Sequence, residues 1–184
     1  VEGGESLSAN QEAKNTVEYF RSVSQLTPYK KSDGAIEAFN KLGLPLVIVG
    51  EGPQEKYLKS IANENIKILG WLSDEKTAEY YKNCYAFIFP GEDDFGITMV
   101  EAMNYGKPVL ALAAGGAKEI VLPSMTGEFF ESSTAEVLAD GVRRLRENYP
   151  RYSSLVIRKW AEKFSVERFR SEVLDFVKKV GYNR

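Results

Sequence analysis

Two carboxylates, Asp93 and Glu101, are separated by seven residues in a segment with the pattern of a strand, a turn and a helix. Residues 85–89 are apolar and rich in aromatic side chains, which predicts a strand, and residues 96–105 have the pattern of a helix closed by Gly106. Asp93 is therefore expected on the loop and Glu101 inside the helix. Carboxylates placed in this way can accept hydrogen bonds from the hydroxyl groups of a sugar or a ribose.

The start of this helix offers a second kind of binding group. Unpaired backbone N–H groups and the positive end of the helix dipole suit a phosphate group. The N–H groups concerned are those of Gly96, Ile97 and Thr98. Together with the carboxylates they predict a site for a sugar nucleotide. An alternative is that the acidic residues 92–94 form a solvated turn that only favours the helix start electrostatically.

Length and composition narrow the class of protein. The 184 residues suffice for one domain with a sizeable core, and a formal net charge of −2 gives no electrostatic footprint for nucleic acid. No apolar run approaches the about 18 residues of a membrane span, and residues 1–5 do not resemble a signal peptide. The single cysteine, Cys84, excludes an intrachain disulfide, fits a reducing compartment and is expected in the core. A cytoplasmic protein is expected.

The chain contains no histidine. This excludes catalysis by Ser-His-Asp or Cys-His groups and removes the usual zinc sites. Any chemistry must therefore come from carboxylates, lysine side chains and the backbone, and no metal site is expected.

Strand and helix patterns alternate after a polar stretch, residues 1–15, which resembles a linker. The predicted strands are 17–24, 44–49, 66–71, 85–89, 108–114 and 127–130, and the predicted helices between them are 32–43, 54–62, 73–83 and 96–105. This alternation predicts an α/β fold with a doubly wound parallel sheet. Beyond Thr134 the pattern is helical only. Its apolar stripes, including the one at Val166, Phe169, Val173, Phe176 and Val180, are predicted to be core, and the last helix could pack on a neighbouring domain.

The turns after the predicted strands deserve inspection because ligands of open α/β sheets bind beyond the carboxyl ends of the strands. The first turn contains Lys30, which could hold a phosphate or be an ordinary solvated lysine. The second, residues 50–53, has two glycines that allow close approach to a ligand. It lacks the third glycine of the dinucleotide fingerprint.

Two further turns carry weaker signals. Residues 70–73 include Trp71, which could flank a base or belong to the core. Residues 114–119 contain two glycines whose N–H groups could face an anion, although a plain loop is the alternative. Five signals at one edge of a sheet favour a site for a nucleoside diphosphate.

With these motifs, the chain resembles the C-terminal, donor-binding half of a GT-B fold glycosyltransferase of family 4, the group 1 glycosyl transferases. The resemblance covers roughly residues 17 to 180 and rests on segments 23–30, 47–53, 69–71, 89–97, 101–103, 106–109 and 115–119. The sequence Asp-Phe-Gly-Ile at 94–97 and the C-terminal segment 160–169 resemble the corresponding segments of a subgroup often described as mannosyltransferases.

This resemblance implies retaining transfer of a hexose, mannose being favoured, from a nucleoside-diphosphate sugar to a glycan or lipid-linked acceptor. It implies no cofactor and no metal, with GDP-mannose favoured over UDP-sugars as co-substrate. Lys30 would neutralise the diphosphate, Glu101 would bind the ribose and Asp93 the donor sugar, so these are the predicted catalytic residues. The residues predicted to bind the donor are Gln25, Gly50, Gly52, Gly70, Trp71, Leu72, Phe95, Gly96, Ile97 and Thr98.

Two positions depart from the family pattern. Gln25 stands where the family usually has an arginine that clamps the diphosphate. Loss of a charge-assisted hydrogen bond of about 1.5–3 kcal/mol would weaken binding roughly ten- to a hundredfold. Asp93 stands where glutamate is usual and is shorter by one methylene, about 1.5 Å of reach.

The resemblance also implies an N-terminal, acceptor-binding domain, which would make any peripheral membrane contact, in a cytoplasmic enzyme at the inner face of the membrane. Residues 16–184 are then the donor-binding domain, expected to be inactive alone.

Two alternative functions stay open. One is a catalytically degenerate sugar-nucleotide binding module, which Gln25 and Asp93 favour. The other is a sugar-nucleotide epimerase, which shares the fold, although the lack of histidine argues mildly against its acid–base chemistry.

Overall fold

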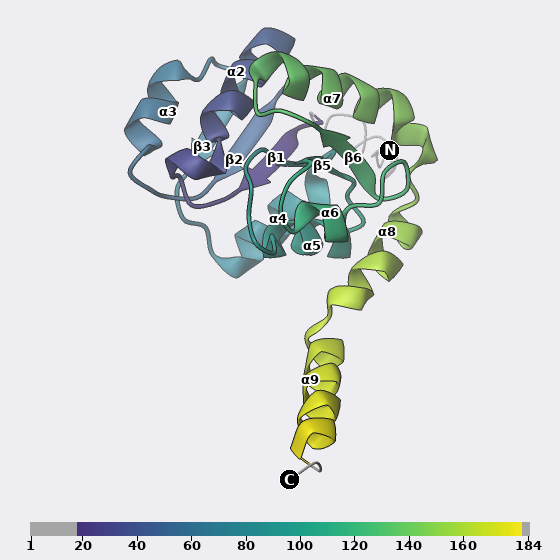
Figure 1. Cartoon of the computed structure of the whole chain (residues 1–184). Helices are drawn as coiled ribbons and strands as arrows, with labels where there is room; N and C mark the ends of the chain where they lie inside the picture. Colours follow the sequence, from purple (N-terminus) through teal and green to yellow (C-terminus); the bar gives the residue numbers. More distant parts are fainter. Residues whose placement is uncertain (1–17, 182–184) are drawn as a thin grey trace, which may run out of the picture.

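The computed structural model describes residues 18–181, so the linker predicted for residues 1–15 lies outside the described residues. One parallel sheet with strand order β3-β2-β1-β4-β5-β6 forms the centre of the molecule (Figure 1). The strands are β1 (Phe20–Val23), β2 (Leu46–Val49), β3 (Ile66–Leu69), β4 (Phe87–Phe89), β5 (Val109–Leu112) and β6 (Gly127–Phe130). The helices are η1 (Pro28–Lys30), α2 (Ser32–Leu42), α3 (Glu55–Ile61), α4 (Asp74–Asn83), α5 (Ile97–Asn104), α6 (Ala117–Ile120), α7 (Ala135–Asn148), η2 (Tyr149–Arg151), α8 (Ser154–Ala161), η3 (Glu162–Phe164) and α9 (Val166–Gly181).

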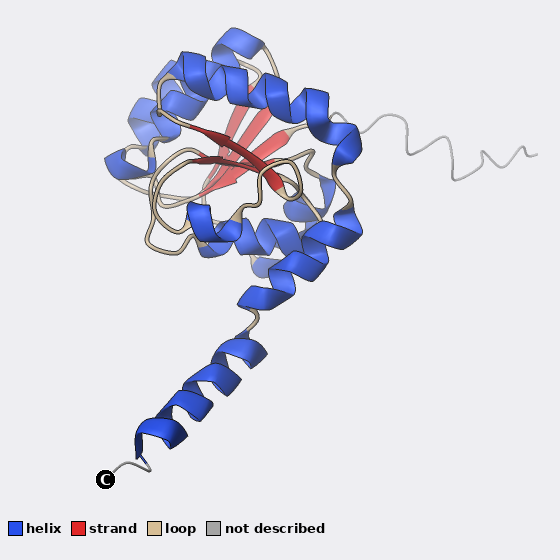
Figure 2. Cartoon of the chain, turned by 45° about the vertical axis from the view of Figure 1, so that its right-hand side comes forward, coloured by secondary structure: helices blue, strands red, loops and turns tan. Residues whose placement is uncertain are grey.

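Helices cover both faces of the sheet (Figures 1 and 2). One apolar cluster lies between the sheet and α2, α3 and α7, and a second lies between the sheet and α4, α5, α6 and α8. Strands buried on both faces need apolar residues at consecutive positions, as in the fully buried run of β2. The predicted doubly wound α/β fold is confirmed.

The strand order reverses between β1 and β4, which are neighbours in the sheet although two strands separate them in the chain. Arg21 of β1 pairs with Phe87 of β4. The turns that follow these two strands therefore emerge side by side, at the type of switch point where open α/β sheets bind their ligands.

Most predicted elements are present, with shorter strands than the apolar runs indicated. The third strand ends at Leu69, so Gly70 and Trp71 belong to the turn that follows it. Trp71 is 74% exposed, which excludes the core role that was its alternative. Cys84 is buried as predicted, and burial raises the pKa of its thiol to about 11.

The last helix corrects one prediction. The apolar stripes of α7 and α8 enter the core through residues such as Leu138, Val142 and Ile157, but no residue of α9 is buried. Figure 2 shows α9 extending away from the sheet. The prediction that its stripe is core is wrong for the described residues, because periodicity shows that a helix has an apolar face without showing which surface covers that face.

Between residues 18 and 181, no helix combines the length and the apolar character needed to cross a membrane. The cytoplasmic location expected from the sequence stays a prediction.

Candidate functional site

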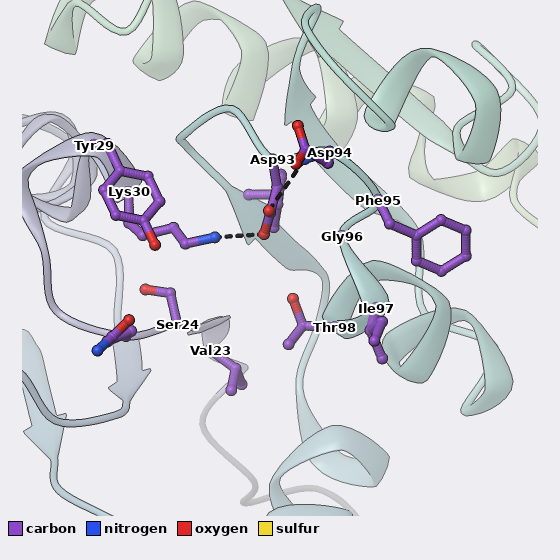
Figure 3. Close-up of a pocket in the computed structure, with 12 residues that line it drawn as sticks. Val23, Ser24, Tyr29, Lys30, Asp93, Asp94, Phe95, Gly96, Ile97 and Thr98 are labelled. Carbon is purple, nitrogen blue, oxygen red and sulfur yellow. Dashed lines mark hydrogen bonds and ion pairs between the residues drawn. The ribbon is translucent and has the colours of Figure 1, made fainter.

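A cavity of about 380 Å³ opens at the switch point, between the turn after β1 and the turn after β4 (Figure 3). The first residues of α5 complete its wall. The lining residues are Val23, Ser24, Gln25, Tyr29, Lys30, Phe89, Asp93, Asp94, Phe95, Gly96, Ile97 and Thr98. Seven residues predicted to form the site are thus brought together here: Gln25, Lys30, Asp93, Phe95, Gly96, Ile97 and Thr98.

Lys30 and Asp93 form an ion pair across this cavity, in which the Lys30 Nζ donates to Asp93 Oδ2 (Figure 3). The Lys30 side chain is 11% exposed and that of Asp93 is 37% exposed. The two turns approach closely because Gly91 has no side chain, since a Cβ there would lie 2.7 Å from Lys30 Cα. The cavity therefore presents a cation and a carboxylate that are already partners of one another.

The loop that carries Asp93 is held from behind by the turn after β5. The Gly116 N–H donates to the Asp93 carbonyl oxygen at 2.9 Å, and a Cβ on Gly116 would lie 2.4 Å from Phe95 O. Gly115 adopts a φ of 51°, which favours glycine. The Gly116 N–H is thus used inside the protein, which corrects the interpretation that it faces an anion. These two glycines support the Asp93 loop.

The start of α5 keeps the donors that the sequence predicted. Gly96 enters the helix with a φ of 87°, in the left-handed region. Among the described residues, the N–H groups of Gly96, Ile97 and Thr98 have no hydrogen-bond acceptor. Phe95 points away from Lys30, and its ring packs edge-on against Phe164 at 6.1 Å (Figure 3). Three backbone donors and a lysine ammonium can therefore meet an anion in one cavity.

The glycines after β2 lie outside the lining of this cavity. A Cβ on Gly50 would lie 1.9 Å from the Ser24 carbonyl oxygen, and one on Gly52 would lie 2.4 Å from the Leu26 carbonyl oxygen. These positions therefore allow the backbone of the first turn to pass closely. Their predicted contact with a ligand stays a prediction.

The turn after β3 also lies apart from the cavity lining. The Trp71 N–H donates to Glu51 Oε1 at 3.2 Å, which joins this turn to the one after β2. Gly70 and Leu72 are partly buried beside the exposed Trp71 ring. The predicted role of residues 70–72 in contacting a base stays a prediction.

Glu101 lines a second cavity of about 280 Å³ on the other side of Thr98 along α5, between α4 and α5. The remaining lining residues are Asp74, Thr77, Ala78, Tyr81, Asn104 and Tyr105. The Tyr81 hydroxyl donates to Glu101 Oε2 at 2.8 Å and lies 3.4 Å from Thr98 O. Burial, followed by the nearby Glu101 carboxylate, raises the pKa of Tyr81, so its hydroxyl stays a donor. Asp93 and Glu101 thus line two separate cavities beside α5.

The sequence interpretation missed several residues at these sites. Tyr29 lines the first cavity, with the Lys30 Nζ 5.0 Å from its ring centroid. Tyr81 positions Glu101, and the fully buried Arg21 contacts the Tyr81 ring. Arg21 had a detectable signal, because it is a charged residue inside a segment that was predicted to be a strand. Tyr81 had none.

In the part of the chain that the structure describes, no three acidic, cysteine or histidine side chains are grouped so that they could hold a metal ion. The cation present in the first cavity is the Lys30 ammonium. Binding of a ligand phosphate there would rest on this side chain and the backbone donors of α5.

Two curated relatives are named mannosyltransferases. The O-antigen chain mannosyltransferase C of Escherichia coli is 26% identical over 81% of this chain and 43% of its own length. The GDP-mannose-dependent alpha-mannosyltransferase of Mycolicibacterium smegmatis is 34% identical over 57% of this chain and 28% of its own length. The chain thus spans less than half the length of these relatives.

Among solved structures, Anabaena HepE in complex with UDP and glucose matches with a TM-score of 0.76 and 21% identity. The match covers 92% of this chain and 50% of that one. It shows a shared fold, that of the GT-B glycosyltransferases.

The family model described as "Glycosyl transferases group 1" matches residues 5–159, which is well over half of the sequence. The match includes both carboxylates, Lys30 and the whole sheet. The chain therefore belongs to the group 1 glycosyl transferases.

Proposed function

We propose that this chain is the donor-binding part of a retaining hexosyltransferase that uses a nucleoside-diphosphate sugar, with GDP-mannose favoured as the donor. The observation that carries the proposal is the first cavity, where Lys30, Asp93 and the free donors of α5 converge at the switch point of the sheet. The names of the two relatives support mannose as the sugar. A glycan or a lipid-linked sugar is the proposed acceptor.

The arrangement suits departure of a diphosphate. As the glycosidic bond of the donor breaks, negative charge grows on the phosphate oxygens. The Lys30 ammonium, whose side chain is 11% exposed, and the α5 N–H groups are placed to stabilise that charge. Asp93 would exchange its bond to Lys30 for hydroxyl groups of the donor sugar, and Glu101 would accept hydrogen bonds from the ribose.

The fold family implies a second domain for the acceptor, and we propose that the complete enzyme forms its active cleft between that domain and this one. The chain spans 28–43% of the two relatives' lengths, which supports this view. Alone, the 184 residues should bind donor nucleotide and transfer no sugar at ordinary enzyme rates. Peripheral membrane contact would belong to the acceptor domain.

Calorimetric titration of the chain with GDP-mannose, GDP, UDP-glucose and UDP tests the donor site. We expect saturable binding of one nucleotide series, with a loss of about tenfold or more in Glu101→Ala. Glu64→Ala is the matched control because Glu64 is exposed and lines neither of these two cavities. Absence of binding of every nucleotide at millimolar concentration would contradict the proposal.

Gln25 favours a second candidate function, a binding module without transferase activity. Gln25 brings a neutral amide to the first cavity, where the family resemblance leads one to expect a second cation. If the chain is a transferase with a weakened clamp, Gln25→Arg should tighten nucleotide binding by about tenfold and raise the rate of the full enzyme. Tighter binding without any gain in rate would support the binding module.

A further inference from the structure

Arg21 is a charged side chain in the middle of a buried strand, with no exposed surface. Its Nη1 donates to the Thr77 carbonyl oxygen at 2.6 Å, while its Nε and Nη2 have no acceptor among the described residues. Burial lowers the pKa of this guanidinium. A buried cation with two unpartnered nitrogens is unfavourable for folding, so its presence requires an explanation.

The nearest aromatic ring is that of Tyr81. The Arg21 Cζ lies 3.7 Å from the Tyr81 ring centroid, a distance that permits a strong cation–π attraction in a desolvated setting. The Tyr81 ring also stacks against Tyr105, with centroids 5.5 Å apart and planes within 8°. Thr77 lies one helical turn before Tyr81 in α4, so Arg21 fixes both that turn and the ring.

The ring that Arg21 holds carries the hydroxyl that binds Glu101. Tyr81 is only 2% exposed, and its hydroxyl donates to Glu101 Oε2 at 2.8 Å. The Glu101 Oε1 receives no hydrogen bond from a described side chain, and Glu101 is partly exposed in the second cavity. One carboxylate oxygen is therefore occupied and the other is available to a ligand.

We propose that Arg21 and Tyr81 are positioning residues that fix the Glu101 carboxylate for the ribose hydroxyls of a nucleoside diphosphate. This inference rests on the proposed function and deepens it. A glutamate side chain with free rotation loses conformational entropy when it binds a ligand, and a carboxylate that is already fixed avoids most of that loss. The cost of burying Arg21 is then linked to ligand recognition through the Tyr81 ring.

A purely structural role would give a different result. Arg21 and Tyr81 also connect β1, α4 and α5, so their loss changes stability in either case. Such a loss would weaken the binding of all nucleotides alike. Loss of positioning should weaken only those nucleotides that have the hydroxyl groups that Glu101 contacts, so the ratio of affinities for ribose and deoxyribose forms separates the two roles.

The experiment compares GDP with 2′-deoxy-GDP and 3′-deoxy-GDP, and UDP with its deoxy forms, by calorimetry on the full chain. In the natural sequence we expect the ribose form to bind about tenfold more tightly than at least one deoxy form. In Tyr81→Phe this preference should fall to about threefold or less, with unchanged affinity for the deoxy form. Tyr80→Phe is the matched control, because Tyr80 precedes Tyr81 in the same helix and its hydroxyl has no hydrogen bond to Glu101.

The single variants of Arg21 give a second test that does not depend on how well Tyr81→Phe folds. Arg21→Met should reduce the ribose preference, and Arg21→Lys should retain part of it. Where Tyr81→Phe folds, Arg21→Met should add nothing in that background. An unchanged preference in Tyr81→Phe and Arg21→Met would overturn the inference, as would an equal loss for all nucleotides. Binding without any ribose preference in the natural sequence would also overturn it while leaving the donor site standing, whereas failure of every nucleotide to bind would contradict the proposed function itself.

Discussion

Asp93 and Glu101 are held in opposite ways, although both lie at or near α5. Asp93 is on a loop, partly exposed, and paired directly with the Lys30 ammonium. Glu101 is in the helix and accepts a hydrogen bond from the neutral hydroxyl of the buried Tyr81, with the Arg21 cation behind that ring. A direct and partly exposed ion pair can exchange partners when a ligand arrives, whereas a carboxylate held by a buried phenol stays in place. The first arrangement suits the reacting part of a ligand and the second suits its fixed part.

The largest effect is expected at the cation of the first region. Lys30→Met should weaken binding of GDP or UDP about ten- to a hundredfold, because it removes a charge-assisted contact from a side chain that is only 11% exposed. Lys56→Met, on the exposed surface of α3, is the control and should change affinity by less than about twofold. Calorimetry measures both. Equal affinity of Lys30→Met and the natural chain would show that the first cavity does not bind the diphosphate.

Gly116→Ala tests whether the support behind Asp93 matters. The new Cβ would lie 2.4 Å from Phe95 O and 2.6 Å from Asp94 O, both backbone atoms, so the loop must shift. We expect a loss of about 1–3 kcal/mol in the free energy of unfolding, measured with urea. Gly181→Ala, where a Cβ meets nothing within 4 Å, is the control. A stability equal to that of this control would mean that the loop tolerates displacement.

The two carboxylates should respond with opposite sign to loss of charge. Asp93→Asn releases Lys30 from a partly exposed pair, so free GDP or UDP should bind about two- to fivefold more tightly. Glu101→Gln should bind the same nucleotide more weakly, because the amide is a poorer acceptor for ribose hydroxyls. Calorimetry on both variants under one salt condition measures the difference. Changes of the same sign would remove the distinction between the two regions.

The smallest effect on the free energy of unfolding is expected for a substitution on the exposed face of α9. Phe176→Ser should change the free energy of unfolding of this chain by less than about 0.5 kcal/mol, since Phe176 is exposed in the described structure. Val142→Ala in α7 should cost about 2 kcal/mol, because Val142 is fully buried. Urea unfolding of the two variants compares them. A large loss in Phe176→Ser would mean that α9 packs on the sheet or on another copy of the chain.

Much of the fold and part of the site could be predicted from the sequence. The apolar runs of the strands and the periodicity of the helices indicated a parallel sheet covered on both faces, because these patterns follow from local geometry. The turn residues Lys30 and Asp93 could be placed at one edge of that sheet for the same reason. Strand ends were less predictable, since an apolar run continues beyond the last ladder hydrogen bond, as at Trp71.

The separation of Glu101 from Asp93 could not be predicted in this way. Their spacing in the sequence suggested one site, but Tyr81 from α4 reaches α5 between Thr98 and Glu101 and divides the space. The contact depends on how α4 packs against α5, which no short-range pattern encodes. The contacts of Arg21 were similarly unpredictable, because Thr77 and Tyr81 lie 56 and 60 positions later in the chain.

The sequence by itself determined the alternation of strands and helices, the absence of histidine chemistry and the position of the charged turns after the strands. These properties depend on the periodicity and type of neighbouring residues. Only the tertiary structure decided that β1 lies beside β4, that Lys30 meets Asp93, that Tyr81 holds Glu101 and that the apolar face of α9 is exposed in the described part of the chain. The physical reason is that strand order and helix packing arise from burial of apolar surface among segments far apart in the chain.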